Sequence, residues 1–244
     1  MSDEFYIGYE PRMPIGLALR IRRVACGLLA LALAMPGVLV LSEDRFAPGV
    51  FEFGRVRTFS GEIVEFPYPA LTSRVVTGET TTYWLVGPGK HGAADIVHGR
   101  DGQRVQLSGT LIQRDQDTMI EVVPHSLVVT ASATRVMEPV QSRGVVTVVG
   151  EIVDAKCHLG VMKPGDGPTH RDCAVRCLLG EIPPMFIPHD HPDLGRISLV
   201  GDAGQPLADA DVFAGRRVLI RGEILQRGSQ RFLAVVRRDI HVLD

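Results

Sequence analysis

Aromatic residues and unbalanced charge are both scarce in this 244-residue chain. Phe, Trp and Tyr together make up 6% of the residues, and the 26 basic side chains nearly balance the 28 acidic ones. A protein dedicated to nucleic acid needs a basic surface, and one that binds single strands also needs stacking aromatic rings. We therefore expect no nucleic-acid partner.

Familiar catalytic sequences are missing as well. The chain has no P-loop sequence, no arrangement of Ser, His and Asp typical of hydrolases, and no pair of carboxylates typical of general acid–base catalysis. These absences favour a protein that is not an enzyme over one that is.

Long apolar runs are also missing, with one exception near the N-terminus. Residues 24–41 carry no charged side chain, and 18 residues of helix extend about 27 Å, close to the thickness of a bilayer core. Four arginines precede this run and two acidic residues follow it. By the positive-inside rule, residues 1–23 are cytoplasmic, residues 24–42 form a single-pass transmembrane anchor, and the remainder lies outside the cytoplasm.

Two other interpretations of this run stay open. Ala32 and Ala34 have the small-x-small spacing of a signal-peptide cleavage site, although apolar residues continue beyond them. A buried helix of a soluble domain is the third interpretation.

The rest of the chain contains an internal duplication. Residues 102–114 (GQRVQLSGTLIQR) align with residues 215–227 (GRRVLIRGEILQR), and residues 119–123 align with residues 232–236 at the same offset. The sequences GEIV and LVG also occur once in each half, in the same order. A turn-like tripeptide separates the two aligned blocks in each half, which predicts a hairpin.

Each half is predicted to form about five short β-strands. Apolar residues alternate with polar ones. Gly109 and Gly222 interrupt these strand runs, which predicts a bulge or a sharp coil in a curved strand. Residues 207–213 of the second half can form one helical turn. This pattern predicts two tandem, OB-like, five-stranded barrels over residues 55–130 and 144–244, joined by a linker. Another small β-barrel or sandwich is the alternative.

The second half carries an insertion, residues 154–193, that the first half lacks. It contains Cys157, Cys173 and Cys177, which are all the cysteines outside the apolar run, and four of the eight histidines. Such clustering of metal-binding and redox-active side chains makes this insertion the strongest candidate site in the chain.

A short helix is predicted near the middle of the insertion. Thr169 can cap its start and Gly180 can end it. His170, Cys173 and Cys177 follow at spacings of three and four, so they share one face of this helix.

Three interpretations of the insertion remain open. Cys157, Cys173 and Cys177, with either His158 or His170, make a Cys₃His set for zinc or another thiophilic metal. Alternatively, Cys157 forms a disulfide with Cys173 or Cys177 and staples the fold. A redox or haem centre is the third interpretation, although the chain has no C-x-x-C-H sequence.

A reactive thiolate at Cys157, or a bound metal with an open coordination position, would instead make the protein a thiol-redox or metal-dependent enzyme. Asp154 and Lys156 flank Cys157, and a lysine this close can lower the pKa of a thiol. We expect, however, that both residues are solvated at the end of a strand.

Three sequence runs in the second half match a known pattern: GEIVDAKCHLG, HRDCAVRC and AGRRVLIRGEILQRG, within residues 146–236. They resemble an uncharacterised family of small exported bacterial proteins that read G-x-V-V-D-x-x-C-Y, then H-x-x-C-A-x-x-C. The matching positions are Asp154, Cys157, His170, Cys173 and Cys177. His158 stands where an aromatic residue is usual, and Glu181 where glycine is usual. The resemblance implies export and an OB-like barrel, and it implies no reaction.

Together these features predict a membrane-anchored periplasmic accessory protein of the bacterial inner membrane. Its second barrel carries a metal or redox centre, and it serves a membrane complex as a subunit or assembly factor. The first barrel is predicted to be a spacer or a docking surface for a protein partner. A thiol-redox or metal-dependent enzyme and a disulfide-stapled interaction module are the alternatives.

Overall fold

The computed structural model describes residues 13–43, 49–74, 80–132, 139–228 and 230–243. The chain divides into an N-terminal unit, Met1–Ala47, and a compact body, Pro48–Asp244. Residues 1–12 of the predicted cytoplasmic segment and residues 133–138 of the predicted linker lie outside the described residues.

The described part of the N-terminal unit contains one long helix, α1 (Ile15–Glu43). It begins before the predicted residue 24 and takes in three of the arginines. Its apolar side chains are exposed on all sides, which is typical of a helix surrounded by lipid. The stretch Ile15–Ser42 is long and apolar enough to span a membrane, and a signal sequence has the same properties.

The body is mainly β-structure. The described part of the body contains strands β1 (Val50–Val64), β2 (Ala70–Arg74), β3 (Thr80–Val86), β4 (Arg104–Arg114), β5 (Asp117–Val122), β6 (Val128–Ala131), β7 (Gln141–Asp154), β8 (Pro184–Pro188), β9 (Ile197–Gly201), β10 (Arg217–Arg227) and β11 (Gln230–Val242). Short helical segments connect them: α2 (Ala94–Val97), η1 (Cys157–Val161), α3 (Arg171–Leu179), η2 (Pro192–Leu194) and η3 (Ala210–Phe213).

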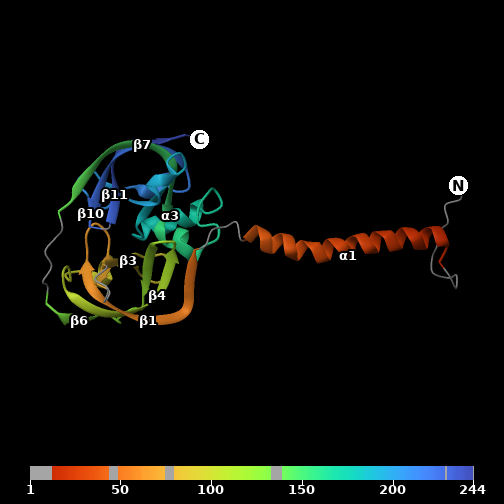
Figure 1. The fold of residues 1–244 in the computed structure, drawn as a ribbon, viewed down its shortest axis with the longest axis horizontal. Coiled ribbons are helices and arrows are strands. Elements are labelled where there is room, and N and C mark those ends of the chain that lie inside the picture. The colour runs from red at the N-terminus through yellow and green to blue at the C-terminus, as the bar shows by residue number, and fades with distance from the viewer. Residues whose placement is uncertain (1–12, 44–48, 75–79, 133–138, 229, 244) are drawn as a thin grey trace. The chain divides into compact units, whose positions relative to one another are not determined.

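The strands form two closed rings with the same pairing order (Figure 1). In the first ring the order is β1-β2-β3-β5-β4, with β4 pairing back to β1, and β6 pairs alongside β4. In the second ring the order is β7-β8-β9-β11-β10, closed by β7 and β10. β3–β5 and β9–β11 are the parallel pairs of the two rings. The repeated sequence blocks therefore occupy equivalent strands.

Several predicted elements are confirmed. The hairpins β4–β5 and β10–β11 lie at the predicted turns, and η3 lies within the predicted helical turn. Gly109 and Gly222 do not separate two strands, because β4 and β10 each run through their glycine. The predicted bulge is confirmed at Gly222, where the pairing of β10 with β11 shifts register between Ile220 and Gly222. A Cβ on Gly109 would clash with the side chain of Ile120, so the glycine admits a close neighbour without ending the strand. β2 and β8 were not predicted, and β8 lies within the insertion.

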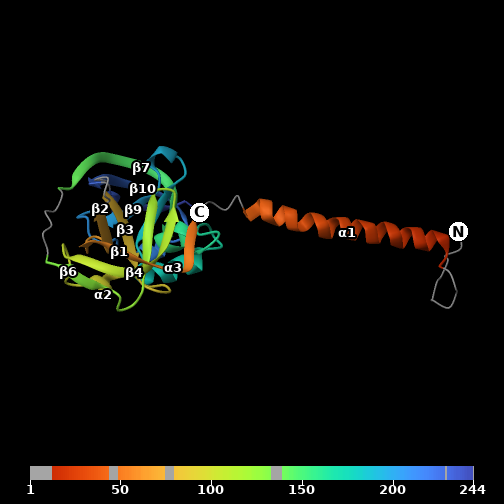
Figure 2. The same cartoon turned by 60° about the horizontal axis from the view of Figure 1, so that its bottom comes forward.

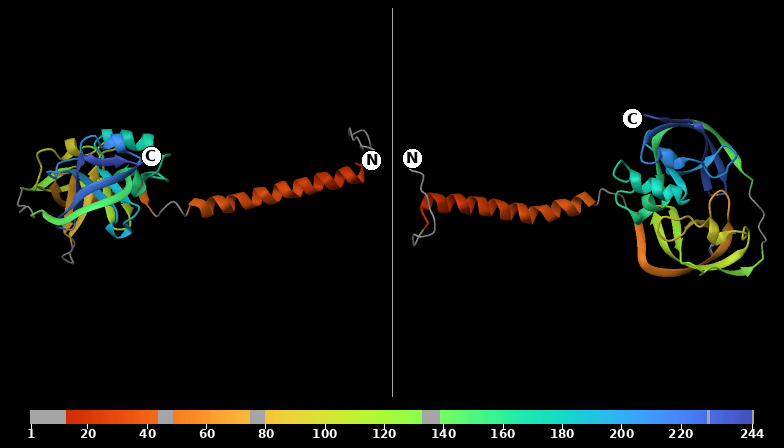
Figure 3. Two further views of the ribbon diagram at one scale, coloured as in Figure 1. Left: turned by 90° about the horizontal axis from the view of Figure 1, so that it is seen from above. Right: turned by 180° about the vertical axis from the view of Figure 1, so that it is seen from behind.

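Three groups of buried apolar side chains hold the body together. One fills the first ring and includes Leu71, Leu85, Leu107 and Ile120. A second fills the other ring and includes Phe186, Leu199, Val218 and Leu233. The third, here called the shared core, combines Val64, Trp84, Ile112 and Met119 of the first ring with Val153, Cys157, Cys177 and Phe232 of the second. The two predicted barrel segments thus lie in one compact unit, and views from other directions show the rings side by side (Figure 2, Figure 3).

Polar contacts reinforce the junction between the rings. The Tyr68 hydroxyl donates to the carbonyl of Leu199 at 2.6 Å and accepts the N–H of Leu207 at 3.1 Å. Arg227 donates to the carbonyl of Phe66 at 2.7 Å. Because these partners come from opposite halves, their hydrogen bonds fix the position of one ring against the other.

The shared core generates a stability prediction. Phe232 is 4% exposed, and its ring lies 6.1 Å from that of Trp84, edge to face. We expect Phe232→Ala to lower the free energy of unfolding by about 3–5 kcal/mol, because it leaves a cavity between the rings. Phe53, which is 84% exposed, supplies a matched control, and Phe53→Ala should change the value by less than about 0.5 kcal/mol. Denaturant unfolding of the full chain in detergent measures both, and equal losses would contradict a shared core.

Candidate functional site

The end of β7 positions the first of the three thiols. β7 ends at Asp154, whose carboxylate accepts the backbone N–H of Cys157 at 2.8 Å. The chain then turns sharply through η1. Backbone packs directly against backbone here, because a Cβ on Gly160 would lie 2.8 Å from Val50, the first residue of β1. The start of the first ring therefore supports the turn that carries Cys157.

Helix α3 supplies the other two thiols. His170 is its N-cap residue, and Gly180 ends the helix as predicted. The predicted cap by Thr169 is wrong, because the helix begins at Arg171 and has no side-chain cap. Both Cys173 and Cys177 point from α3 toward the η1 turn, as the one-face spacing predicts.

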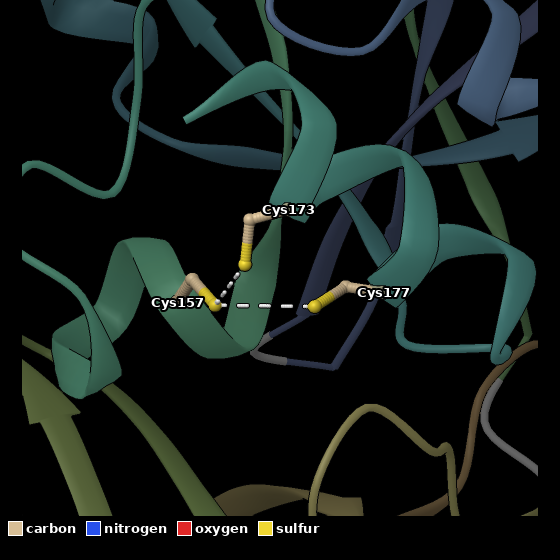
Figure 4. Close-up of side chains that lie close together, drawn as sticks. All are labelled: Cys157, Cys173 and Cys177. Atoms are coloured by element: carbon tan, nitrogen blue, oxygen red, sulfur yellow. Dashed lines mark hydrogen bonds between the residues drawn. The ribbon is translucent and has the colours of Figure 1, made fainter. Parts of the chain in front are cut away.

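The three sulfur atoms converge on one point (Figure 4). Cys157 Sγ lies 3.9 Å from Cys173 Sγ and 3.9 Å from Cys177 Sγ, and all three atoms lie within 4.8 Å of one another. No disulfide joins them. Three sulfur atoms bound to one zinc ion at about 2.3 Å and tetrahedral angles lie about 3.8 Å apart. The group, here called the thiol trio, could therefore hold a metal ion with little movement.

The first ring contributes a cation to the thiol trio. Lys90, in the turn after β3, donates from Nζ to Cys173 Sγ at 2.7 Å and to Cys177 Sγ at 3.7 Å. This lysine is exposed and Cys173 is partly exposed, whereas Cys157 and Cys177 are buried. The trio is therefore reached from solvent along the side that carries Lys90 and Cys173.

A second lysine holds the turn that carries Lys90. Lys156, next to Cys157, donates from Nζ to the carbonyls of Gly87 at 2.8 Å and Gly89 at 2.7 Å. It also pairs with Glu121 of β5. The expectation that Asp154 and Lys156 are solvated is wrong, because the shared packing of the rings leaves them 0% and 2% exposed. Lys90, rather than Lys156, is the lysine that contacts thiols.

The thiols differ in acidity because of these contacts. A hydrogen bond to Cys177 and burial together raise the pKa of the Cys157 thiol far above its usual range. The same hydrogen bond, accepted by Cys177, lowers the pKa of Cys177 to about 7 against the effect of burial, and the charge of Lys90 adds to the lowering. The hydrogen bond to Cys173 raises the pKa of Lys90, which keeps its ammonium group charged. A thiolate is therefore available at neutral pH.

A buried aspartate–histidine pair adjoins the trio. His170 Nε2 lies 2.7 Å from Asp154 Oδ2, and the two residues are 1% and 0% exposed. Asp154, Cys157 and His170 form a second set of potential metal ligands, with ligand atoms within 4.8 Å of one another. Cys157 belongs to both sets and thereby joins the pair to the thiol trio.

His158, the other predicted histidine ligand, faces elsewhere. Its ring nitrogens lie 3.1 and 2.9 Å from Nη1 of Arg114, and Nδ1 lies 3.3 Å from a carboxylate oxygen of Asp166. Burial lowers the pKa of His158, while the hydrogen bond that its ring donates to Asp166 opposes this effect. Neither set of potential metal ligands found among the described residues includes it.

Two features of the site were not predicted from the sequence: the contact of Lys90 with the thiols and the burial of Lys156 against the turn that carries Lys90. A signal for Lys90 was present, because it lies within Gly87–Gly92, a G-x-G-x-x-G run directly after the LVG strand. The helix that follows is only four residues long, and the run serves as the turn that carries Lys90 to the thiols.

Comparisons with protein-family models, curated proteins and solved structures gave no match to this chain. The resemblance to small exported bacterial proteins therefore stays a prediction, and the site has to be interpreted from its own geometry.

The Lys90 contact generates a prediction about thiol acidity. In Lys90→Met the Cys177 thiolate loses a neighbouring positive charge, so its pKa should rise from about 7 and less thiolate should be present at neutral pH. Thiolate absorbance in the ultraviolet, followed against pH in a Cys26→Ser background, measures the change. Lys163→Met removes an exposed lysine that has no contact with the trio and should leave the curve in place. An unchanged curve in Lys90→Met would show that Lys90 does not act on the thiols.

Proposed function

We propose that this protein is a membrane-anchored accessory protein whose thiol trio holds one thiophilic metal ion. The observation that carries the proposal is the convergence of three free thiols: Cys157 Sγ lies 3.9 Å from both Cys173 Sγ and Cys177 Sγ, and all three sulfur atoms lie within 4.8 Å of one another. Two of these thiols come from a helix and the third from a turn after a strand, so the fold itself brings them together.

The charges around the trio favour a divalent ion such as zinc. Three thiolates and one divalent ion leave one net negative charge, which the ammonium group of Lys90 can balance across its 2.7 Å contact with Cys173. A monovalent thiophilic ion such as copper(I) would leave a second negative charge. Zinc with thiolate and imidazole ligands is also a common tetrahedral combination in proteins.

We infer that the two rings are tandem OB-like barrels. Each ring closes five strands in the order 1-2-3-5-4, and a short helical segment, α2 or η3, lies between its third and fourth strands. This arrangement is the one described for the OB-fold. Aromatic residues make up only 6% of the chain and its charge is nearly balanced, which argues against a nucleic-acid ligand.

The membrane setting supports an accessory role. We take α1 as an uncleaved anchor in the bacterial inner membrane, with residues 1–23 in the cytoplasm and the barrels in the periplasm. The length and apolar surface of α1 and the resemblance to exported proteins support this setting. A protein held there beside membrane complexes, with a metal site and no recognisable catalytic set, fits a subunit or an assembly factor.

A thiol-redox enzyme is the second candidate. The lowered pKa of Cys177, about 7, provides a nucleophilic thiolate, and Cys157 lies 3.9 Å away as a resolving thiol. A disulfide-stapled interaction module is the third, and in that case one of the three thiols stays unpaired.

Metal binding tests the proposal directly. The full chain, purified in detergent and reduced, should bind about one zinc ion per chain by elemental analysis. Single substitutions Cys157→Ser, Cys173→Ser and Cys177→Ser should abolish stoichiometric binding, because each removes one of three sulfur ligands. Cys26→Ser is the matched control in α1 and should bind as the native chain does.

Other outcomes would overturn the metal proposal and select an alternative. A metal-free chain that has a single free thiol among the three when it is purified without reductant would indicate a disulfide staple. A metal-free chain whose Cys177 thiolate reduces a model disulfide would indicate a thiol-redox enzyme.

The anchor is tested separately by mass. The protein extracted from membranes should have the intact mass that includes residues 1–23, and alkaline washing should not release it. Leu31→Arg together with Leu33→Arg should weaken membrane insertion, since each central arginine costs about 2.5–3.5 kcal/mol. A soluble product that begins near Met35 would show that α1 is a cleaved signal sequence.

A further inference from the structure

The ring of His170 has two nitrogens with different surroundings. Nε2 lies 2.7 Å from Asp154 Oδ2, whereas Nδ1 is buried and has no hydrogen-bond partner. A buried polar nitrogen without a partner is destabilising, so native proteins nearly always supply one. The structure thus leaves one ligand atom of His170 without an explanation from protein contacts.

The aspartate fixes which nitrogen is available. An ionised Asp154 accepts a hydrogen bond from Nε2–H, and this tautomer leaves a lone pair on Nδ1. Histidines that bind metals commonly donate their other ring N–H to a carboxylate, which orients the ring and makes the free nitrogen a better ligand. The pair therefore has the chemistry of a metal ligand and its positioning residue.

The pair is also tied to the thiol trio through the chain. His170 is the N-cap residue of α3 and precedes Cys173 by three positions, and the backbone N–H of Cys173 donates to the His170 carbonyl at 3.0 Å. On the other side, Asp154 accepts the backbone N–H of Cys157 at 2.8 Å. Ligand atoms of Asp154, Cys157 and His170 lie within 4.8 Å of one another.

We propose that Nδ1 of His170 is the fourth ligand of the ion held by the thiol trio, and that Asp154 is the positioning residue for His170. This inference rests on the proposed metal-binding function. It selects His170 over His158, because the His158 ring is in contact with the guanidinium group of Arg114, and a neighbouring cation disfavours a second one.

A fourth ligand from His170 would complete the coordination of the ion. Three thiolates and one imidazole complete a tetrahedral set, so the ion has no open position for a substrate. A closed site holds its metal and is typical of structural or storage sites rather than of hydrolytic ones. This favours an accessory protein over a metal-dependent enzyme.

Cobalt(II) provides the probe, because its visible absorption reports the ligands of a tetrahedral site. The full chain in detergent should bind one cobalt ion with the spectrum of a three-sulfur, one-nitrogen site. His170→Ala should shift that spectrum and lower the affinity for cobalt at least ~10-fold. Asp154→Asn should lower the affinity about 10–100-fold with a smaller spectral shift. His158→Ala, which removes the other buried histidine paired with an aspartate, should change neither.

A readout that needs no variant accompanies this experiment. X-ray absorption of the zinc-loaded native chain should show three sulfur ligands and one nitrogen with imidazole scattering. Three sulfurs without imidazole, or an unchanged cobalt spectrum and affinity in His170→Ala, would overturn the inference while leaving the metal-binding function in place. Failure of the native chain to bind either ion would overturn both.

Discussion

The ammonium group of Lys156 links the two halves of the molecule at the point where the site is built. It lies between the rings and is 2% exposed. It donates to the backbone carbonyls of Gly87 and Gly89 and pairs with Glu121. Because an isolated charge is very costly to bury, all of these partners must come into place together. These contacts hold the turn that carries Lys90 next to the segment that carries Cys157.

Because of this dependence, the two halves of the duplicated body have different roles in the site. The two halves share a strand order, yet they are not interchangeable, since the second supplies the thiols and the first supplies Lys90 and one wall of the shared core. A spacer would need no such contacts. The site therefore belongs to the pair of rings and not to the insertion alone.

The sequence predicts what is local or repeated, and little that depends on contacts between distant segments. The period-2 pattern and the aligned blocks predicted the hairpins, and the three–four spacing predicted that Cys173 and Cys177 face one way. The burial of Lys156 depends on carbonyls from the other ring, and no local pattern encodes that contact. Likewise, β4 continues through Gly109, where the side chain of Ile120 from β5 occupies the space of a Cβ, and the residues next to Gly109 in the sequence do not reveal that neighbour.

The backbone contact between Gly160 and the start of β1 has a mechanical consequence. Val50 is the first residue of the first strand after the N-terminal unit, and it touches the η1 turn without an intervening side chain. Cys157 is the first residue of this η1 turn. A displacement of Val50 would therefore press on the turn that carries one sulfur of the thiol trio.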